Sequence, residues 1–135
     1  MGVMSYKRVI IKKFGGPEVL KVVEKDCLPE PQTGEVRVKV QHTSANFTDV
    51  MIRKGMYTEI KEQPPFSPGY DMIGVVDKLG PGTNKFEIGQ RVADLPVTGA
   101  YAEYICLPEK NLVSVPDNID SAEAVCVILS YITAY

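Results

Sequence analysis

The sequence predicts a mainly β domain, with a closed or nearly closed sheet and a few short helices. Short runs of β-forming residues recur along the chain, and clusters of glycine and proline separate them. Before Asp120, only one short segment follows a helical period. Many short strands joined by tight turns are typical of barrels and sandwiches, because closing a sheet removes its unpaired edges.

The strands follow from residue type and alternation. Arg8–Phe14 and Leu20–Glu24 are rich in β-forming side chains, and residues 15–17, Gly-Gly-Pro, supply the turn of a hairpin between them. In Glu35–Val40 valines alternate with charged residues, which places the valines on one face of a half-buried strand. Further strands are predicted at Asp71–Leu79, Gln90–Leu95, Ala100–Leu107 and Leu112–Val115.

One short helix is predicted between two of these strands. Asn46 is a good N-cap for a helix that begins at Phe47, and Gly55 stands where a left-handed residue would end it. Phe47, Val50 and Met51 form an apolar stripe. We therefore expect this stripe to anchor the helix to the core.

Polar side chains follow another stripe of the same helix. Asn46, Asp49 and Arg53 stand at i, i+3 and i+7, and Tyr57 follows just beyond the helix end. Polar groups gathered on one side of an anchored helix would form the wall of a cleft. A stripe that simply faces water is the simpler interpretation of the pattern alone.

The last segment changes period. Asp120 and Glu123 resemble the capping box that starts a helix, and Val125, Leu129 and Ile132 repeat with helical spacing. No glycine, proline or basic last turn ends this helix. We therefore expect that it continues into further chain, and that its apolar stripe is exposed where that chain would pack.

Composition restricts the function classes. With 135 residues and a net charge of −2, the chain is one domain without a basic footprint for nucleic acid. No window approaches the ~20 apolar residues of a membrane span, and the N-terminus lacks the apolar part of a secretion signal, so we expect a cytoplasmic protein. Cys27, Cys106 and Cys126 are widely spaced, which argues against a disulfide framework and a four-thiolate zinc lobe.

Three motifs together resemble a known family. Asn-x-x-Asp at residues 46–49 is followed by Arg-x-Gly-x-Tyr at 53–57 and by Pro-Gly-x-Asp-x-x-Gly-Val-Val at 68–76. In this order and spacing they resemble the GroES-like catalytic domain of the medium-chain dehydrogenase/reductase superfamily. They look most like its zinc-independent quinone oxidoreductase branch, which includes zeta-crystallin. The ending at residues 129–135 looks like that of the VAT-1-like members.

The resemblance implies a domain organisation. Residues 1–119 would be the GroES-like domain, a partly open β-barrel, and residues 120–135 would start the helix that leads into a nucleotide-binding Rossmann domain missing from this chain. No G-x-G-x-x-G occurs, because the motif that begins at Gly80 fails at its third glycine. The full-length protein would be a homodimer, since the family usually dimerises through the missing domain.

The resemblance also implies a site without zinc. Zinc-dependent relatives carry Cys-His-Thr-Asp where this chain has Asn46–Asp49, and Gly-His-Glu where it has Gly69–Asp71. An amide and the Tyr70 phenol thus replace a thiolate and an imidazole, while a catalytic zinc normally takes three protein ligands. The lone histidine, His42, is more simply a surface or core residue. Tyr70, and Met51 where bacterial relatives often carry an aromatic residue, would change the size of the pocket.

A site without zinc restricts the substrates that it can reduce. A carbonyl oxygen that gains charge during hydride transfer must then be stabilised by hydrogen bonds. In quinones and enones, conjugation spreads that negative charge over the molecule. The resemblance therefore implies an NADPH-dependent reductase of small-molecule quinones or α,β-unsaturated carbonyls. This chain would be its substrate-side domain, inactive by itself because the cleft needs two walls. A non-enzymatic GroES-like binding or structural module stays open as an alternative, since VAT-1-like and crystallin relatives have acquired such roles.

The resemblance assigns roles to single residues. Asn46 would be both a catalytic and a cofactor-binding residue, close to the nicotinamide and the substrate, although it also suits a helix cap. Asp49 would lie near the cofactor, although a first-turn carboxylate is also favoured locally. Tyr57 would be a catalytic residue at the cleft mouth, with a surface tyrosine as the alternative, and Thr133 would bind the nicotinamide end of the cofactor. For Arg53 the simpler interpretation is an exposed pair with Asp49.

Overall fold

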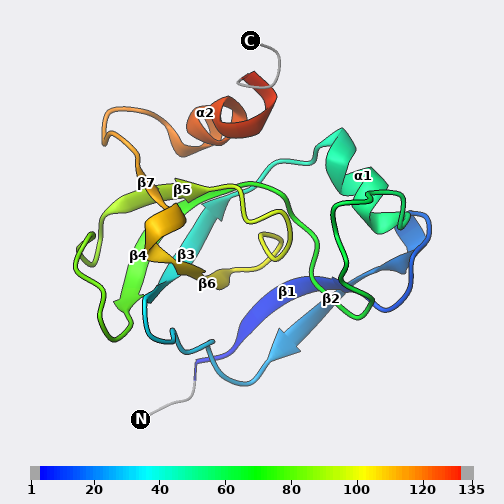
Figure 1. Ribbon diagram of the computed structural model, residues 1–135, viewed down its shortest axis with the longest axis horizontal. Helices are drawn as coiled ribbons and strands as arrows, with labels where there is room; N and C mark the ends of the chain where they lie inside the picture. Colours follow the sequence, from blue (N-terminus) through cyan, green and yellow to red (C-terminus); the bar gives the residue numbers. More distant parts are fainter. Residues whose placement is uncertain (1–3, 132–135) are drawn as a thin grey trace.

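The computed structural model describes residues 4–131, which form two antiparallel sheets and a few short helices (Figure 1). One sheet pairs β1 (Tyr6–Ile11) with β2 (Leu20–Lys25). The other has the order β6-β3-β4-β5-β7, with β3 at Glu35–His42, β4 at Met72–Leu79, β5 at Arg91–Asp94, β6 at Tyr104–Pro108 and β7 at Val113–Ser114. The helices are α1 (Phe47–Arg53) and α2 (Ser121–Cys126), which continues as a π turn at Val127–Tyr131, with 3-10 turns at Pro17–Val19 and Glu109–Asn111. The mainly β class predicted from the sequence is confirmed.

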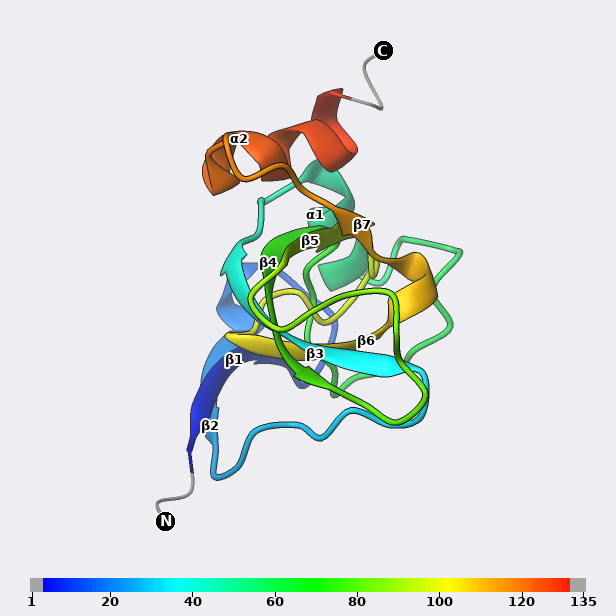
Figure 2. The ribbon, with the colours of Figure 1, turned by 90° about the vertical axis from the view of Figure 1, so that its left-hand side faces the viewer.

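A short irregular segment joins the two sheets. Sequence alternation predicted a strand at Ala100–Leu107, but β6 begins only at Tyr104. The residues before it divide their hydrogen bonds between strands of both sheets. The N–H of Val40 donates to the Glu103 carbonyl at 2.8 Å, the N–H of Glu103 donates to Lys7 at 3.0 Å, and the N–H of Val9 donates to Tyr101 at 2.8 Å. The two sheets thus form one curved, partly open wall (Figure 2).

The core lies inside this wall. As the alternation predicted, Val36 and Val38 of β3 are completely buried, and Val40 packs partly buried against them. Apolar side chains from all five strands of the larger sheet, or from the segments next to them, meet these valines. The remaining buried members of the cluster are Met72, Val76, Phe86, Val92, Ala100, Leu107 and Leu112.

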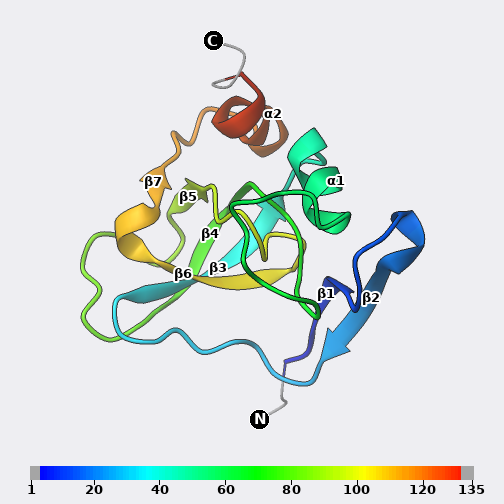
Figure 3. The same cartoon turned by 45° about the vertical axis from the view of Figure 1, so that its right-hand side comes forward.

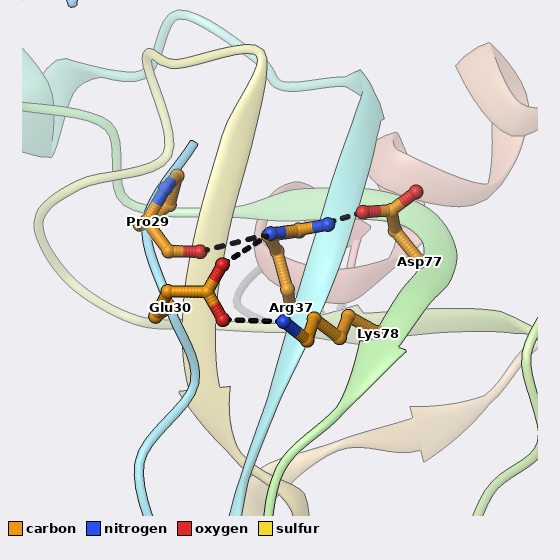
Figure 4. Close-up of polar contacts among 5 residues, drawn as sticks. All are labelled: Pro29, Glu30, Arg37, Asp77 and Lys78. Atoms are coloured by element: carbon orange, nitrogen blue, oxygen red, sulfur yellow. Dashed lines mark hydrogen bonds and ion pairs between the residues drawn. The ribbon is translucent and has the colours of Figure 1, made fainter. Parts of the chain in front are cut away.

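The opposite face of β3 carries a polar network (Figure 4). Arg37 Nε donates to Asp77 Oδ2 at 2.6 Å across the β3–β4 pair, and its Nη1 donates to the Pro29 carbonyl at 3.2 Å. Glu30 Oε1 lies 3.5 Å from that Nη1, and Glu30 Oε2 accepts from Lys78 Nζ at 2.5 Å. These contacts fasten the connection between β2 and β3 to the sheet.

α2 begins where the sequence predicted. The Asp120 carboxylate caps it by accepting from the N–H groups of Ala122 at 3.0 Å and Glu123 at 3.2 Å. Arg91 of β5 donates to Ser121 Oγ at 2.9 Å, which ties the first residue of the helix to the sheet. No helix within residues 4–131 has the length and the apolar character needed to cross a membrane.

The predicted exposure of the apolar stripe of this helix is wrong for Val125. Its side chain is only 3% exposed and packs with Ile73 and Ala93 on the outer face of β4 and β5. Helical spacing defines a stripe but does not define what the stripe faces, and here an apolar sheet surface covers it. Leu129 is half-buried, and Ile132 lies outside the described residues.

Candidate functional site

α1 lies between the β1–β2 hairpin and α2 (Figure 3). The helix begins at Phe47 and ends as the sequence predicted, with Gly55 in the left-handed region at φ 73°. The N–H of Gly55 donates to Ile52 at 3.0 Å, and the N–H of Met56 donates to Met51 at 2.9 Å. This pair of bonds is the Schellman ending of a helix, which needs the glycine conformation.

The inward face of α1 differs from the prediction. Phe47 is 78% exposed and anchors nothing, whereas Ile52 is 2% and Asp49 6% exposed. Asp49 and Ile52 stand three positions apart and so share one face of the helix. The polar stripe therefore points into the protein, because a pocket and not a continuous apolar core lies under it.

That pocket has a volume of about 260 Å³. Asn46, Asp49 and Arg53 all line it, so the structure confirms the cleft wall over the alternative of a stripe that faces water. Arg53 is half-buried and its Nε donates to the Gly15 carbonyl at 3.2 Å; none of the ion pairs among the described residues includes it. The exposed Arg53–Asp49 pair is therefore not observed. The other lining residues are Leu20, Ala45, Val50, Pro68 and Tyr101.

Asn46 links the pocket to a buried carboxylate. Its Nδ2 donates to Ser44 Oγ at 2.9 Å and to Asp71 Oδ2 at 3.1 Å, and lies 3.5 Å from Asp49 Oδ2. The backbone N–H of Asn46 donates to the same Asp49 oxygen at 2.9 Å, the reciprocal half of a capping box. The cap and the cleft thus use the same residue.

Asp71 is completely buried. Its Oδ1 accepts from the backbone N–H of Ser44 at 2.8 Å, and Thr43 Oγ1 lies 3.4 Å away. Its Oδ2 accepts from Ser44 Oγ as well as from Asn46. Among the described residues, all the donors to this carboxylate thus come from the connection between β3 and α1.

The surroundings of Asp49 and Tyr101 favour the neutral forms of these two side chains. Burial raises the pKa of Asp49; the hydrogen bond from the Asn46 backbone opposes this shift, while the nearby charge of Asp71 adds to it. The Oδ1 atom of Asp49 is buried and has no hydrogen-bond partner among residues 4–131. Burial, followed by the charge of Asp49, raises the pKa of Tyr101, whose hydroxyl donates to the Ser44 carbonyl at 3.3 Å.

Tyr57 lies outside this pocket. It lines a separate hollow of about 70 Å³ with Phe14 and Ile52. Its hydroxyl lies 3.3 Å from that of Tyr70 and donates to Glu59 Oε2 at 3.2 Å. The structure therefore brings Asn46 and Asp49 together in one pocket, whereas Tyr57 lines a different hollow. The fourth predicted site residue, Thr133, lies outside the described residues.

Metal-ligating residues are scattered. Within residues 4–131 no three His, Cys, Asp or Glu side chains are grouped closely enough to hold a metal ion. Cys27, Cys106 and Cys126 are free thiols. His42, the last residue of β3, is exposed.

Comparison with known proteins places this geometry in a family. Residues 32–117 match the alcohol dehydrogenase GroES-like domain. This chain belongs to that family. The human synaptic vesicle membrane protein VAT-1 homolog-like is 34% identical over 131 residues, which are 96% of this chain and 30% of that protein. Human quinone oxidoreductase is 32% identical over 130 residues, which are 96% of this chain and 39% of that enzyme.

Solved structures agree. The human VAT-1 homolog-like protein superposes with a TM-score of 0.89 at 33% identity, over 98% of this chain and 41% of that one. Escherichia coli quinone oxidoreductase, solved as a complex with NADPH, gives 0.87 at 29% identity, over 96% of this chain and 39% of that one. The resemblance to the quinone oxidoreductase and VAT-1-like branch of the medium-chain dehydrogenase/reductase superfamily is confirmed. The chain spans less than half the length of these relatives.

The sequence pattern did not identify three residues of this GroES-like domain that belong to the site. Ser44, Asp71 and Tyr101 complete the polar network, but they come from three separate segments. The motif at Gly69–Asp71 points to Asp71 only as a metal ligand, because zinc-dependent relatives carry Gly-His-Glu there. The one available signal for Tyr101 is Gly69, whose φ of 116° lets residues 68–69 pack against the Tyr101 backbone.

Proposed function

We propose that this chain is the substrate-side domain of a zinc-independent, NADPH-dependent oxidoreductase that reduces quinones or α,β-unsaturated carbonyls. The observation that carries this proposal is the pocket wall of α1, where an amide stands between two carboxylates. The similarity to quinone oxidoreductases, one of them complexed with NADPH, supports the same reaction class. The helix that starts at Ser121 would lead into a nucleotide-binding domain, and the 135-residue chain alone would be inactive.

The chemistry of the donors supports a reaction without zinc. The positions that hold thiolate and imidazole ligands in zinc-dependent relatives are occupied by Asn46 and Tyr70. A neutral amide and a phenol are poor zinc ligands. Asp71, the third member of the motif, is committed to the N–H and hydroxyl groups of Ser44 and to Asn46. A carbonyl in this site would therefore be polarised by hydrogen bonds.

The lining of the pocket supports the proposal that the nicotinamide end of the cofactor binds there. The pocket combines apolar surfaces of Leu20, Val50 and Pro68 with polar groups of Asn46 and Asp49. This mixture suits a flat ring that carries a polar substituent. When bound, NADPH would supply the hydride.

Each residue then has a separate task. Asn46 and Asp49, together with Thr133, would position the nicotinamide end of the cofactor against the substrate. The Tyr57 hydroxyl, with that of Tyr70 beside it, would exchange its bond to Glu59 for a bond to the substrate carbonyl at the cleft mouth. Because α1 is anchored by Ile52 and capped at both ends, its groups would keep their positions when a ligand enters.

Binding of NADPH and NADH, followed by fluorescence, tests the proposal. The gene product is prepared at the full length of its relatives, with this 135-residue chain as the control. We expect micromolar binding of NADPH by the long form alone. Asn46→Ala should weaken that binding or slow quinone reduction about 10-fold to 100-fold. A long form that binds neither nucleotide would overturn the proposal and favour the alternative, a GroES-like module without catalysis.

A further inference from the structure

Asp71 is a buried carboxylate without a cationic partner. It is completely buried, and none of the ion pairs among the described residues includes it. Its carboxylate instead accepts hydrogen bonds from the Ser44 N–H and hydroxyl and from the Asn46 amide. Burying a carboxylate lowers the stability of a fold, and an apolar residue could fill the same space without that loss. The carboxylate therefore needs an explanation in terms of what it holds.

The position of Asp71 is fixed from both sides. Thr43 Oγ1 donates to its backbone carbonyl at 2.6 Å. On the other side, Gly69 packs so closely that a Cβ there would lie 2.4 Å from the Tyr101 backbone nitrogen. The N–H of Tyr101 in turn donates to the Pro68 carbonyl at 3.0 Å. Asp71 thus stands on a rigid base immediately before β4.

A carboxylate distinguishes the two ends of an amide. An ionised carboxylate only accepts hydrogen bonds, so the nitrogen end of Asn46 must face it and the oxygen end must face away. Asp71 Oδ2 lies 3.1 Å from Asn46 Nδ2, and Asp49 Oδ2 lies 3.5 Å from the same nitrogen. Ser44 Oγ, at 2.9 Å, donates to Asp71 and so is turned to accept from Asn46. Three acceptors therefore select one orientation of the amide.

We propose that Asp71 is a positioning residue that sets the orientation of the Asn46 amide in the pocket. This inference rests on the proposed function, in which Asn46 meets the reacting groups. An amide free to turn by 180° would offer a donor and an acceptor in alternation. Misplacement of a reacting group by about 1 Å can cost on the order of 100-fold in rate, and loss of a residue that orients a ligand-binding group typically costs about 10-fold to 100-fold.

The first test uses this 135-residue chain and needs no activity. The side-chain NH₂ signals of Asn46 are assigned by 15N NMR, and their exchange with water is measured. Asp71→Asn, which keeps the shape but removes the charge, should raise the exchange rate of these protons about tenfold or more. Asp94→Asn is the matched control, because Asp94 is a half-buried carboxylate on β5 that, within residues 4–131, accepts only from the N–H of its neighbour Leu95 at 2.7 Å.

If Asp71→Asn fails to fold, Ser44→Ala provides the same test, since it removes one acceptor of Asn46 and one donor to Asp71. Unchanged Asn46 exchange in a folded variant overturns the proposal.

The second test uses the full-length protein. Asp71→Asn should lower kcat about 30-fold to 100-fold and change the KM of the quinone and the Kd of NADPH less than about threefold. A merely structural role would lower the amount of folded protein without this separation of kcat from KM. Unchanged kcat overturns the proposal. Full-length wild-type protein without NADPH binding overturns the proposed function instead, and the NMR result then decides alone whether Asp71 orients Asn46.

Discussion

The hydroxyl groups of Tyr57 and Tyr70 lie 3.3 Å apart, and their rings meet edge to face at 89° with centroids 6.2 Å apart. The two tyrosines come from different segments, one just after α1 and one just before β4. An edge-to-face pair of this kind is favourable and resists rotation of either ring. Tyr70 thereby holds Tyr57 in position.

We therefore predict that Tyr70→Ala widens the substrate range. In the full-length protein its kcat/KM for 9,10-phenanthrenequinone, relative to that for 1,4-benzoquinone, should rise about tenfold. Tyr70→Phe keeps the ring and is the control, for which this ratio should stay within about twofold. An equal ratio in both variants would show that Tyr70 does not limit substrate size.

Close packing at Gly69 predicts a large loss of stability on substitution. Gly69 has φ 116° and a Cβ there would lie 2.4 Å from a backbone atom, so Gly69→Ala should lower the free energy of unfolding by about 3 kcal/mol or more. Gly34 has φ 82° with no atom within 4 Å, so Gly34→Ala isolates the backbone strain at about 1 kcal/mol. Urea unfolding of both variants measures the difference. Equal losses would mean that contact with Tyr101 contributes nothing.

The inward face of α1 predicts opposite outcomes for two apolar residues. Ile52 is 2% exposed, so Ile52→Ala should lower the free energy of unfolding by about 3 kcal/mol. Phe47 is 78% exposed, so Phe47→Ala should change it by less than about 0.5 kcal/mol. Denaturant titration of the two variants compares them directly. A larger loss of stability for Phe47→Ala than for Ile52→Ala would support the apolar stripe that the sequence suggested.

These two residues show where sequence reasoning reached its limit. Alternation in Glu35–Val40 identified a strand face, because a strand has only two faces and one was charged. The helix boundaries were equally readable, because caps are local. The face that α1 turns inward was not, since Phe47 is the larger apolar residue and only the pocket explains why Asp49 is buried instead.

The site shows the same division. Asn46 and Asp49 are neighbours on one helix, so their meeting in the pocket followed from the sequence. The contact of Asn46 with Asp71 spans 25 positions and depends on how β4 lies against the β3–α1 connection. No period or local motif carries such a contact. The motif at Gly69–Asp71 was visible, but what its carboxylate holds was not.

Burial of Asp49 predicts a pH-dependent stability. Its pKa is raised above the usual 3.8 by burial, so the folded state holds the proton more tightly than the unfolded state. The resulting stability is present below the unfolded pKa and is lost as the pH rises through the folded pKa. Asp49→Asn cannot ionise and keeps an acceptor for the Asn46 N–H. The Tm of this variant should therefore rise relative to the Tm of the wild type as the pH increases from 3.5 to 7.

Thermal unfolding at several pH values measures this difference. A difference that stays flat, or that falls as the pH rises, would contradict the raised pKa of Asp49.

We predict that the two ion pairs drawn in Figure 4 contribute unequally to the free energy of unfolding. The Arg37 side chain is 12% and the Asp77 side chain 31% exposed, so Arg37→Met should lower the free energy of unfolding by about 1 kcal/mol. Lys78 and Glu30 are 46% and 67% exposed, so Lys78→Met should change it by less than about 0.5 kcal/mol. The Arg37 effect should persist in 1 M NaCl. Its disappearance in salt would mean that the pair is screened like a surface pair.

The segment that joins the two sheets couples the hairpin to the pocket. The N–H of Val9 donates there to the carbonyl of Tyr101, whose side chain lines the pocket. Local detachment of β1 and β2 would therefore remove the backbone support of Tyr101 and one wall of the pocket. An attached hairpin is thus also a condition for an intact site.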